Sequence, residues 1–202
     1  VRTAEDQSDH FEDLLGTYLV KLSTRRISAA DSNEAARLLK IIGDFERIAD
    51  HGVNLVQSVE ELRSKKMNFS PSAMAELTVL TKAVEEILGL SLDAFLKDDY
   101  NAAGMVEPLE QVIDGLKEQL RTSHILRLQK EECSIEAGFV WADLLTDLER
   151  VSDHCSNIAG CIMDMHQGKL NLHESLRAMK EDRAQFDERC RMYRQKYALP
   201  VE

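Results

Sequence analysis

Apolar residues recur every three to four positions along most of the chain, with charged and polar residues between them. This spacing places the apolar residues on one side of a helix, and no stretch shows the strict alternation of a half-buried strand. Six helices are expected, at about residues 2–26, 32–65, 71–97, 105–130, 135–168 and 172–197. The pattern therefore predicts an all-α protein.

Polar residues that can cap helices mark several of the expected starts. Asp31 followed by Glu34 has the spacing of a capping box before the second helix. Ser70, directly before a proline, fits the start of the third helix. Ser134 can cap the fifth helix, and Asn171 is the capping residue expected for the sixth.

The chain contains an internal repeat. The segment DFERIADHGVN at residues 44–54 returns as DLERVSDHCSN at residues 147–157, with six of eleven residues identical at an offset of 103. A Glu-x-x-x-Asp pair is also repeated at an offset of 105, first as Glu5 and Asp9 and then as Glu110 and Asp114. A repeat of this length predicts two copies of one structural unit. We expect a first unit at residues 1–68, a second at 69–168 and a C-terminal helix at 169–202.

Each unit contains two helices with a Glu-x-x-x-Asp pair on one side, because residues four apart lie about 40° apart around a helix. In an antiparallel hairpin, facing residues have numbers with a constant sum. The sum is 55 in the first unit and 263 in the second, and half of each sum falls at an expected turn. Glu5 would then face Asp50, and Asp9 would face Glu46. The eight acids brought level in this way are Glu5, Asp9, Glu46 and Asp50, and Glu110, Asp114, Glu149 and Asp153.

Four facing carboxylates repel one another, so they either keep extra protons or bind a cation. The whole chain is acidic, with 25 basic and 36 acidic residues and a net charge of −11, which disfavours nucleic-acid binding. Clusters of oxygen ligands suit hard cations such as Mg, Mn, Ca or Fe, with Zn as a further candidate. The sequence therefore predicts a divalent or trivalent metal ion in each hairpin.

Six polar residues beside the acidic pairs are candidates for supporting the metal ligands. They are Arg47, His51, Asn54, Arg150, His154 and Asn157. Both arginines lie three residues before an acid and can pair with it. Both histidines point about 140° away from the first acid of the pair, so a supporting or surface role is expected instead of direct ligation. Asp44 and Asp147 point away from the acidic pairs and are expected in solvent.

Other readings of the acidic pairs are less consistent with the sequence. A lone Glu-x-x-x-Asp pair usually lies on a solvated helix face, but four such pairs in register make that interpretation less consistent with the sequence. A ferritin-like di-iron protein also binds metal between helices, through Glu-x-x-His. None of the six histidines has a glutamate three residues earlier. A purely structural helical array would interleave basic residues with the acids, and this occurs only at Arg47 and Arg150.

The remaining chemistry in the sequence indicates no enzyme. No nucleophile with a neighbouring base, phosphate-binding glycine loop or zinc-finger spacing stands out, so we expect no catalysis. The four cysteines are scattered and are expected to be small buried residues. Trp141, Phe45 and Phe139 are expected in the core. No stretch reaches the roughly 18 apolar residues that a membrane-spanning helix needs.

The two repeated segments, DFERIADHGVN and DLERVSDHCSN, resemble the repeated E(D)xxxD signature of PhoU domains, the regulators of bacterial phosphate uptake. The resemblance covers the whole chain. It implies two three-helix bundles related by a pseudo-twofold axis, with iron or other divalent metals bound at the acidic motifs. The first bundle departs from the family pattern, because the helix that normally precedes its first acidic pair is absent. The sequence also begins with Val1, so a truncated first repeat is expected.

The C-terminal segment FDERCRMYRQKYALP resembles the end of PhoU-like domains joined to bacterial sodium/phosphate cotransporters. This resemblance implies a regulatory cytoplasmic domain tethered to or associated with the inner membrane. Its partner would be a membrane phosphate transporter, for example a transmembrane domain missing from the N-terminus of this sequence, with a homodimer as a further option. The alternative is a stand-alone PhoU-type regulator of phosphate uptake.

Overall fold

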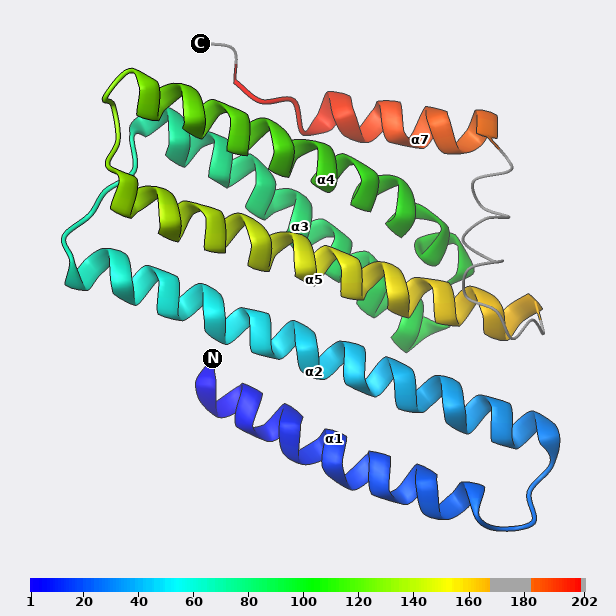
Figure 1. The fold of residues 1–202 in the computed structure, drawn as a ribbon. Coiled ribbons are helices and arrows are strands. Elements are labelled where there is room, and N and C mark those ends of the chain that lie inside the picture. The colour runs from blue at the N-terminus through cyan, green and yellow to red at the C-terminus, as the bar shows by residue number, and fades with distance from the viewer. Residues whose placement is uncertain (168–182, 201–202) are drawn as a thin grey trace.

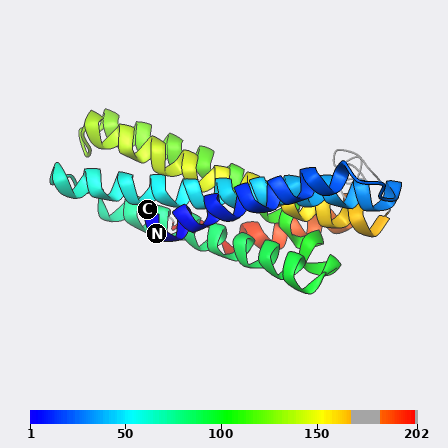
Figure 2. The same cartoon turned by 90° about the horizontal axis from the view of Figure 1, so that it is seen from below.

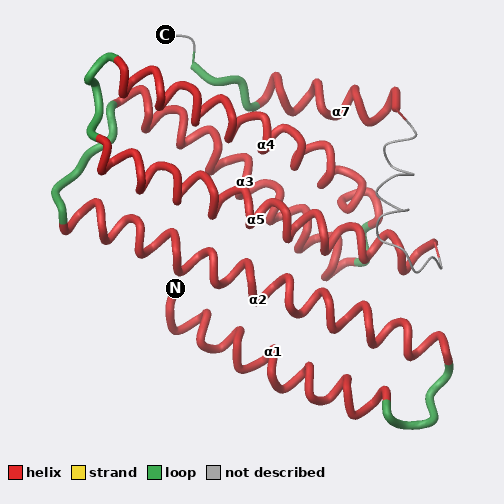
Figure 3. The backbone as a smooth tube through the Cα atoms, in the orientation of Figure 1, coloured by secondary structure: helices red, strands yellow, loops and turns green. Residues whose placement is uncertain are grey.

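The computed structural model of the protein describes residues 1–167 and 183–200, and every regular element in these two ranges is a helix (Figure 3). The helices are α1 (Arg2–Ser23), α2 (Ala29–Ser64), α3 (Pro71–Lys97), α4 (Tyr100–Gln129), α5 (Ile135–Gln167) and α7 (Arg183–Lys196). The predicted all-α fold is confirmed. The first part of the sixth expected helix, with its capping residue Asn171, lies outside the described residues, and its last part corresponds to α7.

The starts of α3 and α5 agree with the sequence, and the start of α2 differs. Ser70 and Ser134 cap α3 and α5, since their hydroxyls accept hydrogen bonds from backbone N–H groups three residues later, at 3.2 and 3.1 Å. The capping box of α2 lies three residues earlier than predicted. The Ser28 hydroxyl accepts from the Asp31 N–H at 3.1 Å, and the Asp31 carboxylate accepts from the Ser28 N–H at 3.3 Å. Glu34, one turn further on, is not part of the box.

Replacing Ser28 with alanine is expected to lower the free energy of unfolding by about 1 kcal/mol, because an N–H group of the first turn loses its acceptor. Glu34→Ala is the matched control, since it removes the side chain that the wrong register would have used. Its effect on stability should be within about 0.5 kcal/mol. Urea unfolding of the two variants measures the difference. A larger loss of stability in Glu34→Ala than in Ser28→Ala would contradict a capping box at Ser28 and Asp31.

The start of α4 also comes earlier than expected. The carboxylate of Asp99 accepts hydrogen bonds from the N–H groups of Asn101 and Ala102, at 2.9 and 3.1 Å, and so starts the helix at Tyr100. Asp98, just before it, has a left-handed φ of 52° and ends α3. The connection between the two helices is therefore only two residues long, where the sequence pattern suggested a longer break.

The helices form two groups (Figures 1 and 2). α1 and α2 make an antiparallel hairpin at one side of the molecule, and α2 lies along α5. α3, α4 and α5 pack against one another, and α7 lies on α4. α1–α2 and α4–α5 are the two hairpins of the internal repeat, and α2 and α5 form the contact between them. The repeat boundaries at residues 68 and 168 stay a prediction.

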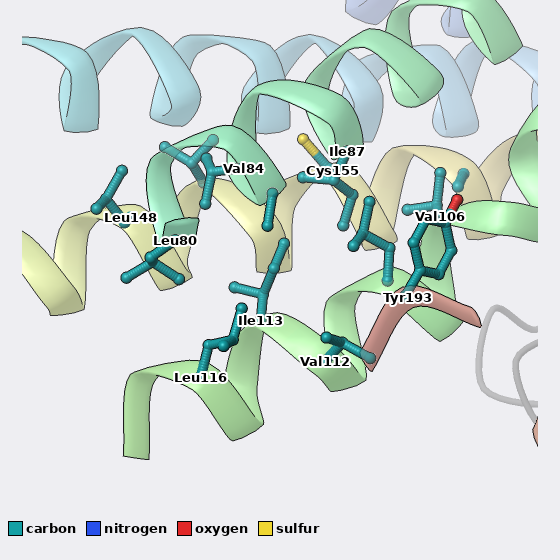
Figure 4. Packing of buried hydrophobic residues seen from close by; sticks show 14 of the residues in the cluster. Leu80, Val84, Ile87, Val106, Val112, Ile113, Leu116, Leu148, Cys155 and Tyr193 are labelled. Carbon is teal, nitrogen blue, oxygen red and sulfur yellow. The ribbon is translucent and has the colours of Figure 1, made fainter. Parts of the chain in front are cut away.

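Aliphatic side chains of α3, α4 and α5 fill the space between these helices (Figure 4). Leu80, Ile87 and Ile113 are fully buried there, and Leu148 and Cys155 of α5 lie in the same cluster. Burying such a side chain contributes roughly 1.5–3 kcal/mol. The second repeat therefore holds the main core, and this core supports the side chains on the outer faces of α4 and α5.

The three aromatic residues expected in the core have different positions. Trp141 is 1% exposed and lies in the core, as predicted. Phe45 is half-buried and packs edge-on against Phe95, with ring centroids 5.2 Å apart. Phe139 is 69% exposed, so its placement in the core was wrong. It comes two residues before Trp141, about 200° around the helix, and therefore faces solvent when Trp141 faces inward.

α7 covers a defect in α4. Pro108 lies inside α4 and has no N–H group, so the carbonyl of Gly104 loses its usual helical donor. The Arg189 guanidinium of α7 donates to this carbonyl at 2.7 Å, and Phe186 and Tyr193 of the same helix are buried.

Among the described helices, none combines the length and the apolarity needed to span a bilayer.

Candidate metal centre

Three acids of the second hairpin converge on one point. Glu110 and Asp114 come from α4 and Asp153 comes from α5, and one carboxylate oxygen of each lies within 4.8 Å of the others. Within the described residues, this is the only group of three such ligands. The hairpin register derived from the sequence predicted this meeting, since Glu110 and Asp153 share the expected sum.

Crowding changes the proton affinity of these acids. The pKa of Asp114 is raised, first by partial burial and then by repulsion from Glu149, and Lys117 opposes the shift. The pKa of Asp153 is also raised, by burial and by Glu149, and Arg150 opposes the shift. Raised carboxylate pKa values mean that the site destabilises its own negative charge. A cation bound among these oxygens would relieve that repulsion.

Glu149, the fourth predicted ligand of this hairpin, is held to one side. Its carboxylate pairs with the Lys117 ammonium at 3.0 Å, and the Arg150 guanidinium lies 3.8 Å away. Arg150 pairs more closely with Asp153, at 3.0 Å, as its position one turn before that acid predicted. The second hairpin therefore has three convergent oxygens and a fourth carboxylate beside them that a lysine neutralises.

The acids of the first hairpin are close together but do not form a three-oxygen group within the described residues. The pKa of Glu5 is raised by partial desolvation and by the charges of Asp6, Asp50 and Asp9. The pKa of Glu46 is raised by burial, by Asp50 and by the charge of Glu12, and lowered by Arg47. Glu5 and Asp50 thus face each other as predicted. Glu12, which the sequence analysis did not select, is an additional acid at this site.

The second hairpin provides the chemistry that a hard cation needs. Its three ligand atoms are all oxygens, which suits Mg, Mn, Ca or Fe better than a soft ion. The site is partly exposed, because Asp114 faces solvent and the other two acids are half-buried. Water could therefore complete a coordination shell that three carboxylates leave open. The residues fit a metal ion of this class.

A second polar arrangement joins the two repeats. The imidazole of His154 on α5 lies 2.8 Å from the Asp44 carboxylate on α2, and the Asn157 amide donates to the same oxygen at 3.2 Å. The first repeat makes the equivalent contacts. His51 and Asn54 on α2 contact one Asp147 oxygen on α5, at 2.8 and 3.2 Å. The two imidazole rings stack, with centroids 5.7 Å apart.

These contacts correct the predicted environment of both aspartates. Asp44 is 6% exposed and Asp147 is 9% exposed, so neither lies in solvent as expected. The sequence analysis considered each helix only against its own hairpin, but these faces of α2 and α5 meet across the pseudo-twofold axis. The histidine and asparagine that follow each acidic pair thus bind the aspartate of the opposite repeat. The residues identical in both copies include all three members of this contact.

The sequence profile of the PhoU domain family matches residues 1–59 and 77–162, which include α1, most of α2, and the acidic pairs of both hairpins. The chain belongs to the PhoU family. One match lies in each half of the molecule, as expected for a tandem PhoU repeat. The predicted family is confirmed.

Curated relatives and a solved structure support this assignment. The chain is 27% identical to the phosphate-specific transport system accessory protein PhoU homolog 1 of Thermotoga maritima over 143 residues, 71% of this chain and 60% of that protein. It is 26% identical to the corresponding PhoU homolog of Pseudomonas aeruginosa over 185 residues, 90% of this chain and 75% of the relative. The crystal structure of PhoU from Pseudomonas aeruginosa superposes with a TM-score of 0.76 at 23% identity, covering 83% and 80% of the two chains. The PhoU fold is therefore shared.

Proposed function

We propose that this PhoU family member is a non-catalytic regulator of phosphate transport. The observation that carries the proposal is the PhoU profile match over both hairpins. The relatives from Thermotoga maritima and Pseudomonas aeruginosa are named accessory proteins of a phosphate-specific transport system. The chain spans 60% of the first relative's length, so its partner and activity are inferred from that shared part.

The proposed partner is a membrane phosphate transporter, and the proposed location is the cytoplasmic side of the inner membrane. The relatives favour a stand-alone regulator over a domain of a sodium/phosphate cotransporter, because they are named as separate accessory proteins. The cotransporter interpretation rests on the resemblance of the C-terminal segment, which forms α7 in this fold. Self-association into a homodimer is compatible with both interpretations.

The regulatory site would be the acidic face of the second hairpin. Glu110, Asp114 and Asp153 would hold the metal, and Glu149 could join them if Lys117 released it. A bound cation would supply positive charge that cancels the repulsion between these acids and fixes α4 against α5. The acids of the first hairpin, with Glu5 and Asp50 opposed, are the candidate for a second ion. Iron, manganese, magnesium and zinc are the ions proposed.

A transport assay tests the proposed function. The chain is produced in a bacterial strain that lacks its own PhoU protein, and uptake of radiolabelled phosphate is measured. We expect uptake to move toward the rate of the parent strain, and Asp153→Asn to reduce this effect. Asp143→Asn, an exposed acid ten residues earlier on α5, is the matched control and should behave like the unchanged chain. Uptake equal to that of the empty strain, with the chain present at normal levels, would contradict the proposal.

A further inference from the structure

A cavity of about 480 Å³ lies between α4 and α5, on the hairpin that carries the metal candidate. Two basic side chains from α4, Lys117 and Arg121, line it together with the rings of His124 and Trp141. Leu145 adds an apolar wall. Arg121 is largely exposed, and its nearest acid, Glu118, is 3.9 Å away. The cavity thus combines positive charge at its edge with an aromatic and aliphatic interior.

Two residues of the same wall carry buried nitrogens. His124 is 7% exposed and Trp141 is 1% exposed, and their rings stack with centroids 5.9 Å apart. Within the described residues, neither His124 Nε2 nor Trp141 Nε1 has a hydrogen-bond partner. Burial, and then the charge of Arg127, lowers the pKa of His124, which favours the neutral ring. The indole N–H can only donate, so the group that would satisfy it is an acceptor.

The absence of a side chain at Gly138 leaves room for the His124 ring. A Cβ atom at residue 138 would lie 2.7 Å from His124 Nε2, closer than any real contact allows. Gly138 is also part of the cavity wall. Alanine or any larger residue at this position would therefore displace the His124 ring.

The first hairpin, built from the same repeat, lacks these groups. By the repeat offsets, the counterparts of Lys117 and Arg121 are Glu12 and Gly16, and those of His124 and Trp141 are Leu19 and Leu38. The first hairpin therefore has no basic residue and no ring at these four positions. Leucines occupy the two positions that correspond to the rings. The basic and aromatic set is specific to the second hairpin.

We propose that this cavity binds a small organic anion, with a phosphate or carboxylate group attached to an apolar group. Arg121 and Lys117 hold the charged end, and Trp141 and Leu145 contact the apolar part. Lys117 also pairs with Glu149 at 3.0 Å, so the bound anion and the acidic cluster share one cation. An anion that draws Lys117 away leaves Glu149 available to the cluster formed by Glu110, Asp114 and Asp153.

The only tryptophan of the chain lies in the cavity wall, so its fluorescence reports on the cavity directly. The protein is titrated with phenyl phosphate and, separately, with benzoate, while Trp141 emission is recorded. A saturable change with at least one of the two is expected. Phenol, which lacks the charge, and inorganic phosphate, which lacks the apolar group, should each give a much weaker response. Chelator is present throughout, so the result does not depend on metal binding or on regulation of transport.

Charge reversal at the edge of the cavity tests the proposed site. Arg121→Glu should weaken binding of the responding probe at least roughly tenfold, since a charge-assisted contact is lost. Arg191→Glu on α7 makes the same charge change at an exposed position outside the cavity and should leave binding unchanged. Two results would overturn the proposal. They are no saturable response to either organic anion, and a response that Arg121→Glu and Arg191→Glu weaken equally.

Discussion

Replacing Asp44 with alanine is expected to lower the free energy of unfolding by about 3 kcal/mol. The Asp44 carboxylate is the acceptor for His154 and Asn157 of the other repeat, and it lies in the buried contact between α2 and α5. The substitution removes both hydrogen bonds at once and leaves two donors without an acceptor. Asp147→Ala removes the equivalent contact to His51 and Asn54, and should have a similar effect.

Urea unfolding with a matched control separates this contact from a general loss of charge. Asp143→Ala removes an exposed aspartate of α5, and should change stability by less than about 0.5 kcal/mol. A double-mutant cycle between Asp44→Ala and His154→Ala should give a coupling of about 1–3 kcal/mol, since the two side chains touch. A loss in Asp44→Ala no larger than in Asp143→Ala would show that the repeats do not depend on this contact.

The second large effect is a reversal of the pH dependence of stability by metal. Because the pKa values of Asp114 and Asp153 are raised in the folded chain, the folded state binds more protons than the unfolded state above the ordinary aspartate pKa of 3.8. In chelator, these two acids should therefore make the chain less stable as pH rises through the window between 3.8 and their raised values. With Mn²⁺ present, deprotonation creates the binding site, and stability should rise with pH over the same window.

Thermal unfolding at pH 7 measures how much the metal stabilises the folded chain. Free Mn²⁺ at about one hundred times its Kd stabilises the folded chain by about 2.7 kcal/mol, or roughly 5–10 °C in Tm. The double variant Asp114→Asn, Asp153→Asn should melt higher than the unchanged chain in chelator, because the repulsion is gone, and should gain nothing from Mn²⁺. Asp143→Asn should follow the unchanged chain in both conditions. Equal responses of the double variant and the unchanged chain to Mn²⁺ would contradict a cation site at these acids.

The helices and the acidic hairpins could be predicted from the sequence because both depend on local spacing. Helical periodicity located the helices to within a few residues, and the constant sum of facing positions brought Glu110 and Asp153 together. The capping box of α2 was misplaced because Asp31 has suitable partners on both sides, Ser28 before it and Glu34 after it. Only the backbone geometry decides between the two.

The contact between the repeats could not be predicted in the same way. It depends on how α2 packs against α5, and no rule of spacing within one hairpin fixes that packing. One signal was present, because Asp, His and Asn keep the same spacing in both copies. The different environments of Glu149 and of its counterpart Glu46 also depend on residues of the facing helix. Lys117 holds Glu149, but the corresponding residue of the first hairpin is Glu12, which repels Glu46.

Elemental analysis of the protein purified without chelator is the most direct test of the proposed metal centre in the second hairpin. We expect about one or more bound metal ions per chain. The Asp114→Asn, Asp153→Asn variant should lose the ion of the second hairpin, with its affinity lowered at least about a hundredfold. The Asp9→Asn, Asp50→Asn variant should keep that ion. A metal content near zero in the unchanged chain, or the same content in the unchanged chain and the second-hairpin variant, would contradict a metal centre at Glu110, Asp114 and Asp153.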